Sequence, residues 1–274
     1  MPYQAEISRK NPTCLVFMID QSGSMADALP DGSGLNKSHA VADAINKLLQ
    51  NFIVRNTATE AIYDRFHVCV IGYGVSVGPA FSGALRGEKL VPLSLVAEHP
   101  RMETRTKKVP DGAGGLVEQQ VTFPVWFDAI SCGSTPMADA FEQSASVVSD
   151  WIKSHPDCFP PIVLNISDGE PDTDPLRQAN SLKNLRTSDG EVLVFNAHVS
   201  SDLGSPVKFP DNDSSLPNGN ARLLYKLSSV LPTRMRDLAK PEFQLSDNAR
   251  GFVYNGELVD IINFLDIGTR VTAR

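Results

Sequence analysis

The segment TCLVFMID, Thr13–Asp20, places apolar residues at nearly every position. Such a strand is apolar on both faces, so other elements must cover both sides of it, which is typical of a central strand in a parallel sheet. Further strands rich in Val, Ile and Phe are predicted at residues 66–74, 161–168, 191–200 and 250–255. The sequence therefore predicts a sheet that is buried between two layers.

Helical periodicity occupies the segments between these strands. Apolar residues recur at steps of three and four from about Asn36, and a second stripe of this kind covers residues 136–152. A third helix begins with Asp174 as its N-cap and Pro175 in the first turn, and a last helix covers residues 257 to about 268. This alternation predicts an α/β fold with a doubly wound (Rossmann-like), mostly parallel sheet flanked by helices.

Two segments interrupt the alternation. Residues 83–127 contain the stretches KLVPLSLV and EQQVTFPVWF around glycine-rich turn sequences at residues 111–115, which predicts a β-excursion from the edge of the domain. Residues 200–220 form a long polar loop rich in Pro, Gly, Asp and Asn. We expect one domain over residues 1–274, with its core at about 13–269, and a hypothesis is that both segments provide specificity around a ligand site.

Charge and composition exclude several classes of function. The net charge is −7, and the 25 Lys and Arg residues form no concentrated basic stripe, so we expect no nucleic-acid partner. No apolar run is long enough to cross a membrane, and the first residues, MPYQAEISRKNPT, lack the apolar region of a secretory signal. The expected location is cytoplasmic, with four buried, reduced cysteines: Cys14, Cys69, Cys132 and Cys158.

Small oxygen-bearing side chains gather at the predicted strand ends. Asp20, Ser22 and Ser24 form a D-x-S-x-S pattern, Thr135 precedes the helix at Pro136, and Asp168 ends another strand. Carboxylate and hydroxyl oxygens without nitrogen or sulfur suit a hard cation such as Mg²⁺. Taken singly, Ser22 and Ser24 are equally explained as caps of the turn into the next helix. Thr135 is also explained as an N-cap, alone or together with a ligand role, and Asp168 as a turn residue.

The order of these elements resembles the von Willebrand factor A (VWA) domain, through DQSGSM, GSTPM and ISDGEP. The resemblance spans most of the chain and implies a VWA fold with an intact metal-ion-dependent adhesion site (MIDAS). It implies that Asp20, Ser22, Ser24, Thr135 and Asp168 hold Mg²⁺, with Mn²⁺ or Ca²⁺ as alternatives. The open coordination position would take an Asp or Glu carboxylate from a protein partner.

The same resemblance implies a biological setting. The chain is similar to the intracellular bacterial VWA proteins of tellurite-resistance and stress clusters, which work with a kinase and a phosphatase or with an AAA+ ATPase as scaffold or regulatory partners. In the VWA family, entry of the threonine into the metal shell is coupled to a shift of the final helix. The element that would move here covers residues 257 to about 268.

An enzymatic function is the alternative hypothesis. The sequence contains no G-x-S-x-G nucleophile motif, and its DGAGG stretch lacks the pattern of a phosphate-binding loop. A metal-dependent phosphohydrolase with Asp20 as nucleophile stays open, although serines stand where such sites bring a second carboxylate. Asp172 and Asp174 have two interpretations, holding a second cation or tuning the rim of the site, and for Asp174 a helix cap is favoured. We expect a non-enzymatic binding module.

Overall fold

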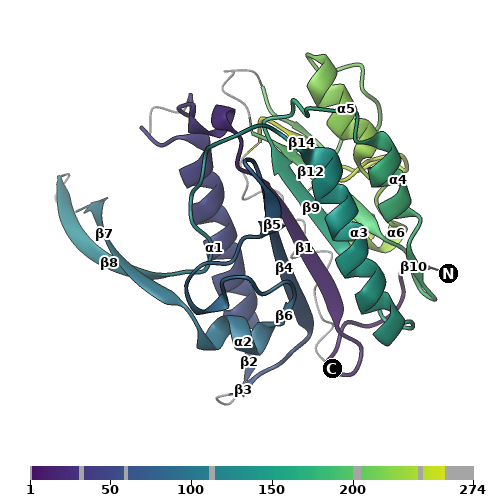
Figure 1. Cartoon of the computed structure of the whole chain (residues 1–274), viewed down its shortest axis with the longest axis horizontal. Coiled ribbons are helices and arrows are strands. Elements are labelled where there is room, and N and C mark those ends of the chain that lie inside the picture. The colour runs from purple at the N-terminus through teal and green to yellow at the C-terminus, as the bar shows by residue number, and fades with distance from the viewer. Residues whose placement is uncertain are drawn as a thin grey trace.

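The computed structural model describes residues 2–30, 34–58, 61–110, 115–199, 205–239 and 243–256. Its centre is a mostly parallel sheet in the order β13-β14-β12-β9-β1-β4-β5, with the short strand β6 paired to β4 (Figure 1). The sheet strands are β1 (Thr13–Asp20), β4 (Phe66–Tyr73), β5 (Val77–Pro79), β6 (Val91–Pro92), β9 (Ile162–Ser167), β12 (Leu193–His198), β13 (Val207–Lys208) and β14 (Phe252–Tyr254).

Strand β1 lies in the middle because its side chains are apolar on both faces. All eight of its residues are buried, and it pairs in parallel with β4 on one side and β9 on the other. The chain adds β4 on one side of β1, and it then crosses over to add β9, β12 and β14 on the other side. The strand order therefore changes direction between β1 and β9, as in doubly wound folds. The predicted fold class is confirmed.

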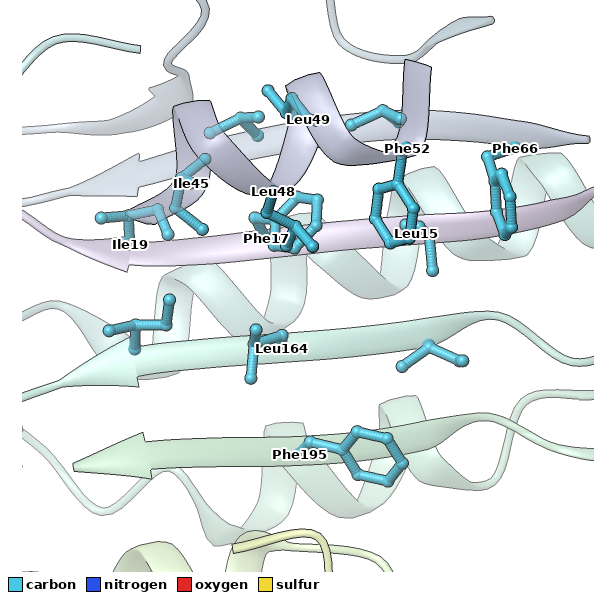
Figure 2. Close-up of a cluster of buried hydrophobic side chains, with 14 of the residues drawn as sticks. Leu15, Phe17, Ile19, Ile45, Leu48, Leu49, Phe52, Phe66, Leu164 and Phe195 are labelled. Carbon is cyan, nitrogen blue, oxygen red and sulfur yellow. The ribbon is translucent and has the colours of Figure 1, made fainter. Parts of the chain in front are cut away.

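Two layers of helices cover the sheet (Figure 1). Helix α1 (Lys37–Arg55) packs its apolar stripe on Leu15, Phe17 and Ile19 of β1, as Figure 2 shows. The opposite core joins Cys14, Val16 and Met18 of the same strand to helices α3 (Met137–Ser154), α4 (Leu176–Lys183) and α5 (Gly219–Leu227). Burial of one such side chain contributes about 1.5–3 kcal/mol, so β1 is fixed from both sides.

The predicted β-excursion is correct only in its second half. Residues 93–98, expected to be extended, form helix α2 (Leu93–Glu98) after the short 3-10 turn η2 (Gly83–Leu85). Asp64 accepts hydrogen bonds from the backbone N–H of Ser94 at 2.8 Å and from its hydroxyl at 3.0 Å. A side chain distant in sequence thus caps the helix start, which otherwise leaves N–H groups unpaired. The turn sequence at residues 111–114 lies outside the described residues.

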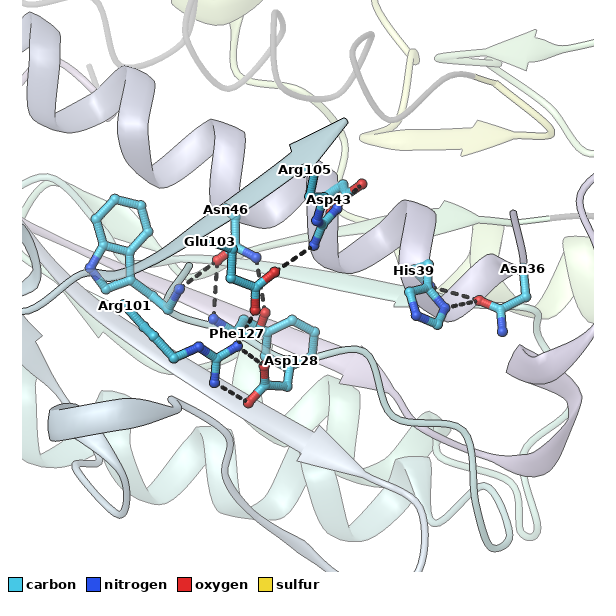
Figure 3. Close-up of polar contacts among 10 residues, drawn as sticks. Asn36, His39, Asp43, Asn46, Arg101, Glu103, Arg105, Phe127 and Asp128 are labelled. Atoms are coloured by element: carbon cyan, nitrogen blue, oxygen red, sulfur yellow. Dashed lines mark hydrogen bonds and ion pairs between the residues drawn. The ribbon is translucent and has the colours of Figure 1, made fainter. Parts of the chain in front are cut away.

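The excursion itself is the long hairpin of β7 (Arg101–Pro110) and β8 (Leu116–Val125), which lies beside α1 away from the sheet (Figure 1). Its base is tied to α1 by the contacts that Figure 3 draws. Arg105 Nη1 donates to Asp43 Oδ1 at 2.7 Å, and the Asn46 amide donates to the Phe127 carbonyl at 2.9 Å. These bonds hold the hairpin against the side of α1 that faces away from the sheet (Figure 1).

The rest of the described chain adds short elements that the sequence did not predict. Helix α5 and helix α6 (Thr233–Ala239) are two of them, and β13 lies within the predicted loop of residues 200–220. The final helix predicted over residues 257 to about 268 lies outside the described residues. The remaining short elements are η1 (Gly23–Ala26), β2 (Thr57–Ala58), β3 (Ala61–Ile62), β10 (Arg186–Thr187) and β11 (Gly190–Glu191).

The cysteine prediction is correct for three of four residues. All four thiols are free, and Cys14, Cys69 and Cys158 are buried, whereas Cys132 is exposed on the loop before α3. Cys132 is exposed because its loop lies over the carboxyl ends of the strands and not inside the sheet. Within the described ranges, no helix has the length and apolar character needed to cross a membrane.

Candidate metal centre

Four of the five predicted site residues follow the two strands on either side of the change in strand order. Asp20 is the last residue of β1, with Ser22 and Ser24 in the turn after it, and Asp168 directly follows β9. Because β1 and β9 run parallel in register, with Ile19 opposite Ile166, their carboxyl ends meet at the same edge. Ligand sites of open α/β sheets form at such an edge.

Asp20 is a buried carboxylate with only part of its hydrogen-bonding capacity used. Its side chain is 1% exposed; Oδ1 accepts from the Ser22 backbone N–H at 2.9 Å, and Oδ2 accepts from the Ser167 hydroxyl at 2.6 Å. Burial raises the pKa of Asp20 above its usual value, the Ser167 and Ser22 contacts oppose this, and the nearby charge of Asp168 adds to it. A cation beside this group would stabilise its charged form.

Ser22 and Ser24 present two hydroxyl oxygens next to Asp20. Their Oγ atoms lie 3.0 Å apart, with Ser22 buried and Ser24 exposed. Neighbouring ligands of an octahedral Mg²⁺ with bonds of about 2.0–2.1 Å are about 2.9 Å apart. The hydroxyl pair therefore fits two adjacent positions of such a shell. Ser22 stands at the N-cap of the 3-10 turn η1 but makes no side-chain cap bond, and Ser24 lies inside the turn.

The loop that carries Thr135 is joined to the loop after β1 by backbone hydrogen bonds. Cys132 N–H donates to the Gln21 carbonyl at 2.6 Å, and Gly23 N–H donates to the Gly133 carbonyl at 3.0 Å. Gly133 has a φ of +95°, and a Cβ there would lie 2.4 Å from the Val75 backbone nitrogen. Only glycine allows this close approach.

Thr135 itself is buried and held by Asp172. The Thr135 backbone N–H donates to Asp172 Oδ1 at 3.0 Å, and the Asp172 N–H donates to the Thr135 carbonyl at 3.0 Å. Asp172 was predicted either to bind a second cation or to tune the rim of the site, and in the structure it holds the backbone of a proposed ligand. The predicted N-cap of α4 is displaced by one residue: Pro175 stands at the N-cap, and Asp174 before it accepts from the Leu176 N–H at 3.0 Å.

Asp168 is paired with a lysine that the sequence analysis missed. Lys37 Nζ donates to Asp168 Oδ2 at 3.1 Å, and the side chains are only 5% and 10% exposed. The same ammonium lies 3.4 Å from the Ser24 carbonyl oxygen and 3.4 Å from Asp27 Oδ2. Lys37 therefore links the two halves of the site. A lysine at a helix start gives no sequence signal for such a contact.

The structure thus joins four of the predicted residues at one edge of the sheet: Asp20 with Ser22, Ser22 with Ser24, and Asp168 with Ser24 through Lys37. The loop that carries Thr135 reaches the same edge through the bond from Gly23 to Gly133. Over the described ranges, no three His, Cys, Asp or Glu side chains gather as a metal cluster. A cation at this edge would therefore be coordinated in part by hydroxyl oxygens. Such a donor set, with few anionic ligands, suits a hard ion.

One end of the predicted loop 200–220 borders this site. A Cβ on Gly169, which follows Asp168, would lie 3.2 Å from the Cβ of Asn220 in α5. The β7–β8 hairpin lies beside α1 instead (Figure 1). Of the two segments expected to surround the site, only the loop has a described residue next to it.

No family model and no curated protein matches the chain. Among solved structures, the SpRpn10 VWA domain has a TM-score of 0.43 at 14% identity and covers 96% of this chain and 100% of its own. The pilus adhesin SpaC of Lactobacillus rhamnosus GG has a TM-score of 0.46 at 14% identity over 96% of this chain.

A third structure, the vWF domain of the type V pili tip protein Mfa5 from Porphyromonas gingivalis, has a TM-score of 0.34 at 10% identity over 59% of this chain. The chain spans 39% of that Mfa5 chain and 31% of SpaC. Identities and TM-scores this low do not support assigning the activity or the partner of any of these three proteins to this chain. The fold class rests on the strand order and the helix layers described above.

Proposed function

We propose that this chain is a VWA-type protein-interaction module that binds one Mg²⁺ ion and, through it, a carboxylate of a protein partner. Asp20, Ser22, Ser24, Thr135 and Asp168 would hold the ion directly or through water. Mn²⁺ and Ca²⁺ are alternative ions for the same oxygen ligands.

One observation carries this proposal: the two serine hydroxyls lie 3.0 Å apart beside a carboxylate that is 1% exposed. Burying a carboxylate without a compensating charge is costly, and Asp20 makes no ion pair among the described contacts. A cation at the hydroxyl pair would offset that cost. The donor set and spacing suit Mg²⁺, which prefers oxygen ligands in octahedral geometry.

The partner class follows from the coordination shell. The protein offers few anionic ligands, so a bound dication keeps residual positive charge and attracts an anion. Ser24 is exposed, which leaves the outer side of the shell open to solvent. An Asp or Glu side chain from another protein is the simplest anionic ligand for that position, and such a ligand supports binding more than catalysis.

A non-enzymatic role is favoured over a metal-dependent phosphohydrolase. Metal-dependent phosphoryl transfer commonly uses two ions about 3.5–4 Å apart, held by several carboxylates or histidines. Over the residues that the structure describes, such a cluster does not form. The second carboxylate, Asp168, is paired with Lys37 at 3.1 Å. Hydrolysis of p-nitrophenyl phosphate that needs both Mg²⁺ and Asp20 would support the alternative.

We further propose a role as scaffold or regulatory component of an intracellular bacterial stress or defence system. This finer assignment rests on the resemblance of the GSTPM and ISDGEP segments to the tellurite-resistance group. Kinase, phosphatase or AAA+ ATPase genes beside the gene would support it. A neighbourhood of surface-protein genes would oppose it.

The site is tested by titration calorimetry with Mg²⁺ and Mn²⁺ on the wild-type protein and on Asp20→Ala, with and without sodium acetate as the carboxylate probe. We expect the wild type to bind the metal, Asp20→Ala to lose it, and acetate to bind only when metal is present. Equal metal binding by both proteins would contradict the proposal. Asp174→Ala, which removes the acceptor of the Leu176 N–H at the start of α4, is the matched control.

A further inference from the structure

Lys37 is a buried cation at the edge of the proposed metal site. It is the first residue of α1, and its side chain is 5% exposed. The ammonium faces three acceptors: Asp168 Oδ2 at 3.1 Å, Asp27 Oδ2 at 3.4 Å and the Ser24 carbonyl oxygen at 3.4 Å. An ammonium has three donors, so these contacts can satisfy it completely.

The position of Lys37 is unfavourable for an ordinary structural lysine. A positive charge in the first turn of a helix opposes the helix dipole, and a buried ammonium loses its hydration. The helix does not need Lys37 as a cap, because Asn36 Oδ1 already accepts from the His39 N–H at 2.9 Å. Its burial is therefore explained by the carboxylate and the carbonyl that it faces at the site.

We propose that Lys37 is a built-in counter-charge that weakens cation binding at Asp20, Ser22 and Ser24 and makes it dependent on an acidic partner. This inference rests on the proposed function. The ammonium contacts both the backbone of Ser24 and the carboxylate of Asp168. A dication bound at the serine hydroxyls is thus repelled by Lys37 and competes with it for Asp168.

A carboxylate from a partner relieves that repulsion. With Asp20 and Asp168 ionised, their two negative charges balance the dication, and the Lys37 charge then faces only Asp27. The Asp27 side chain is 62% exposed, so solvent screens it and it offsets the Lys37 charge only in part, which leaves an excess of positive charge. An incoming carboxylate neutralises the excess, so it binds more tightly to the loaded site and in turn strengthens metal binding. The coupling is reciprocal by thermodynamic necessity.

The test compares Mg²⁺ titrations of the wild type and Lys37→Met, each with and without acetate. We expect Lys37→Met to bind Mg²⁺ about tenfold more tightly or more without acetate, since a unit charge beside a dication at a partly buried site has an effect of this size. We expect acetate to strengthen Mg²⁺ binding less in the variant than in the wild type. Loss of a merely structural lysine would instead leave Mg²⁺ binding equal or weaker, and that result overturns the inference.

Two further variants and one readout keep the test decisive. Lys37→Gln keeps a hydrogen-bonding side chain without charge. If Lys37→Met does not fold, Lys37→Gln takes its place in the titrations, with the same expected increase in Mg²⁺ affinity. Lys153→Met removes an exposed pair with Asp150 and should leave Mg²⁺ affinity unchanged. Without metal, the melting temperature of Lys37→Met should fall because Asp168 loses its partner, and Mg²⁺ should restore it by more than it raises the wild type.

Different results of this experiment overturn the proposed function and the role of Lys37. A wild type that binds no Mg²⁺ overturns the proposed function. A wild type that binds Mg²⁺ through Asp20, with a folded Lys37→Met of equal or lower Mg²⁺ affinity, overturns only the role of Lys37.

Discussion

A chain of buried polar side chains crosses the sheet directly below the site, and it gives the sharpest stability prediction. The Tyr73 hydroxyl donates to Asn165 Oδ1 at 2.7 Å, and Asn165 Nδ2 donates to Asn196 Oδ1 at 2.9 Å. Asn196 Nδ2 donates to the Ser228 hydroxyl at 2.9 Å, and Ser228 donates to the Leu224 carbonyl at 2.8 Å. All four side chains are fully buried, so solvent water does not reach them to replace a lost hydrogen-bond partner.

Asn165→Ala breaks this chain in its middle. It removes the acceptor of the Tyr73 hydroxyl and the donor to Asn196, and each group left unpaired costs about 1–3 kcal/mol. The expected loss in free energy of unfolding is therefore about 2–6 kcal/mol. Ser228→Ala removes the acceptor of the Asn196 amide and the hydroxyl donor to the Leu224 carbonyl. Because that carbonyl still accepts from the Ser228 N–H at 3.1 Å, only one group is left unpaired, and the cost should be about half as large.

Urea unfolding followed by circular dichroism measures both losses. Asn165→Leu serves as the matched control, because it fills the volume and still leaves both groups unpaired. If Leu costs as little as a conservative core change, under about 1.5 kcal/mol, the cavity and not the polar chain explains the effect of Ala. Tyr73→Phe should reduce the cost of Asn165→Ala, and strictly additive losses would refute the coupling.

Three further predictions concern the site and its surroundings. Asp172→Ala should weaken Mg²⁺ binding several-fold while costing about 0.5–1.5 kcal/mol of stability, since it releases the Thr135 backbone; unchanged calorimetry would contradict this. Burial, with a smaller effect of His155, lowers the pKa of His67 below 6.5, so folding favours the neutral ring that accepts from Trp151 at 2.8 Å. Stability from this group is present above pH 6.5 and lost as pH falls through the lowered pKa, and His67→Gln should flatten that loss in urea midpoints. A maleimide should modify Cys132 in the native protein well before the three buried cysteines, and equal rates in mass spectrometry would refute its exposure.

The central strands were predictable because their signal is local. Thr13–Asp20 is apolar on both faces and is buried at all eight positions, so composition alone indicated a central strand. Helix α1 likewise begins where Asn36 supplies a cap and an apolar stripe follows. The meeting of Asp20 and Asp168 at one edge followed from parallel strands, without knowledge of any distance.

The missed features depend on contacts between residues distant in sequence. Helix α2 begins at Leu93 after a proline without a side-chain cap, and Asp64 supplies the bonds from elsewhere in the chain. Lys37 shows no local pattern that marks it as a site residue, and the sequence placed Asp172 near the site without showing its bond to Thr135. Their partners, Asp168 and Thr135, come from other elements, and only the folded arrangement reveals those contacts.

The most direct test of the account is a crystal grown with Mn²⁺ and measured at the manganese absorption edge. The account predicts one anomalous peak in contact with the Ser22 and Ser24 hydroxyls, next to Asp20, with at least one coordination position filled by water or by a carboxylate. Absence of that peak in an Asp20→Ala crystal grown in parallel would complete the result. A peak at another place, or none at saturating Mn²⁺, would contradict the proposal that these residues form a metal centre.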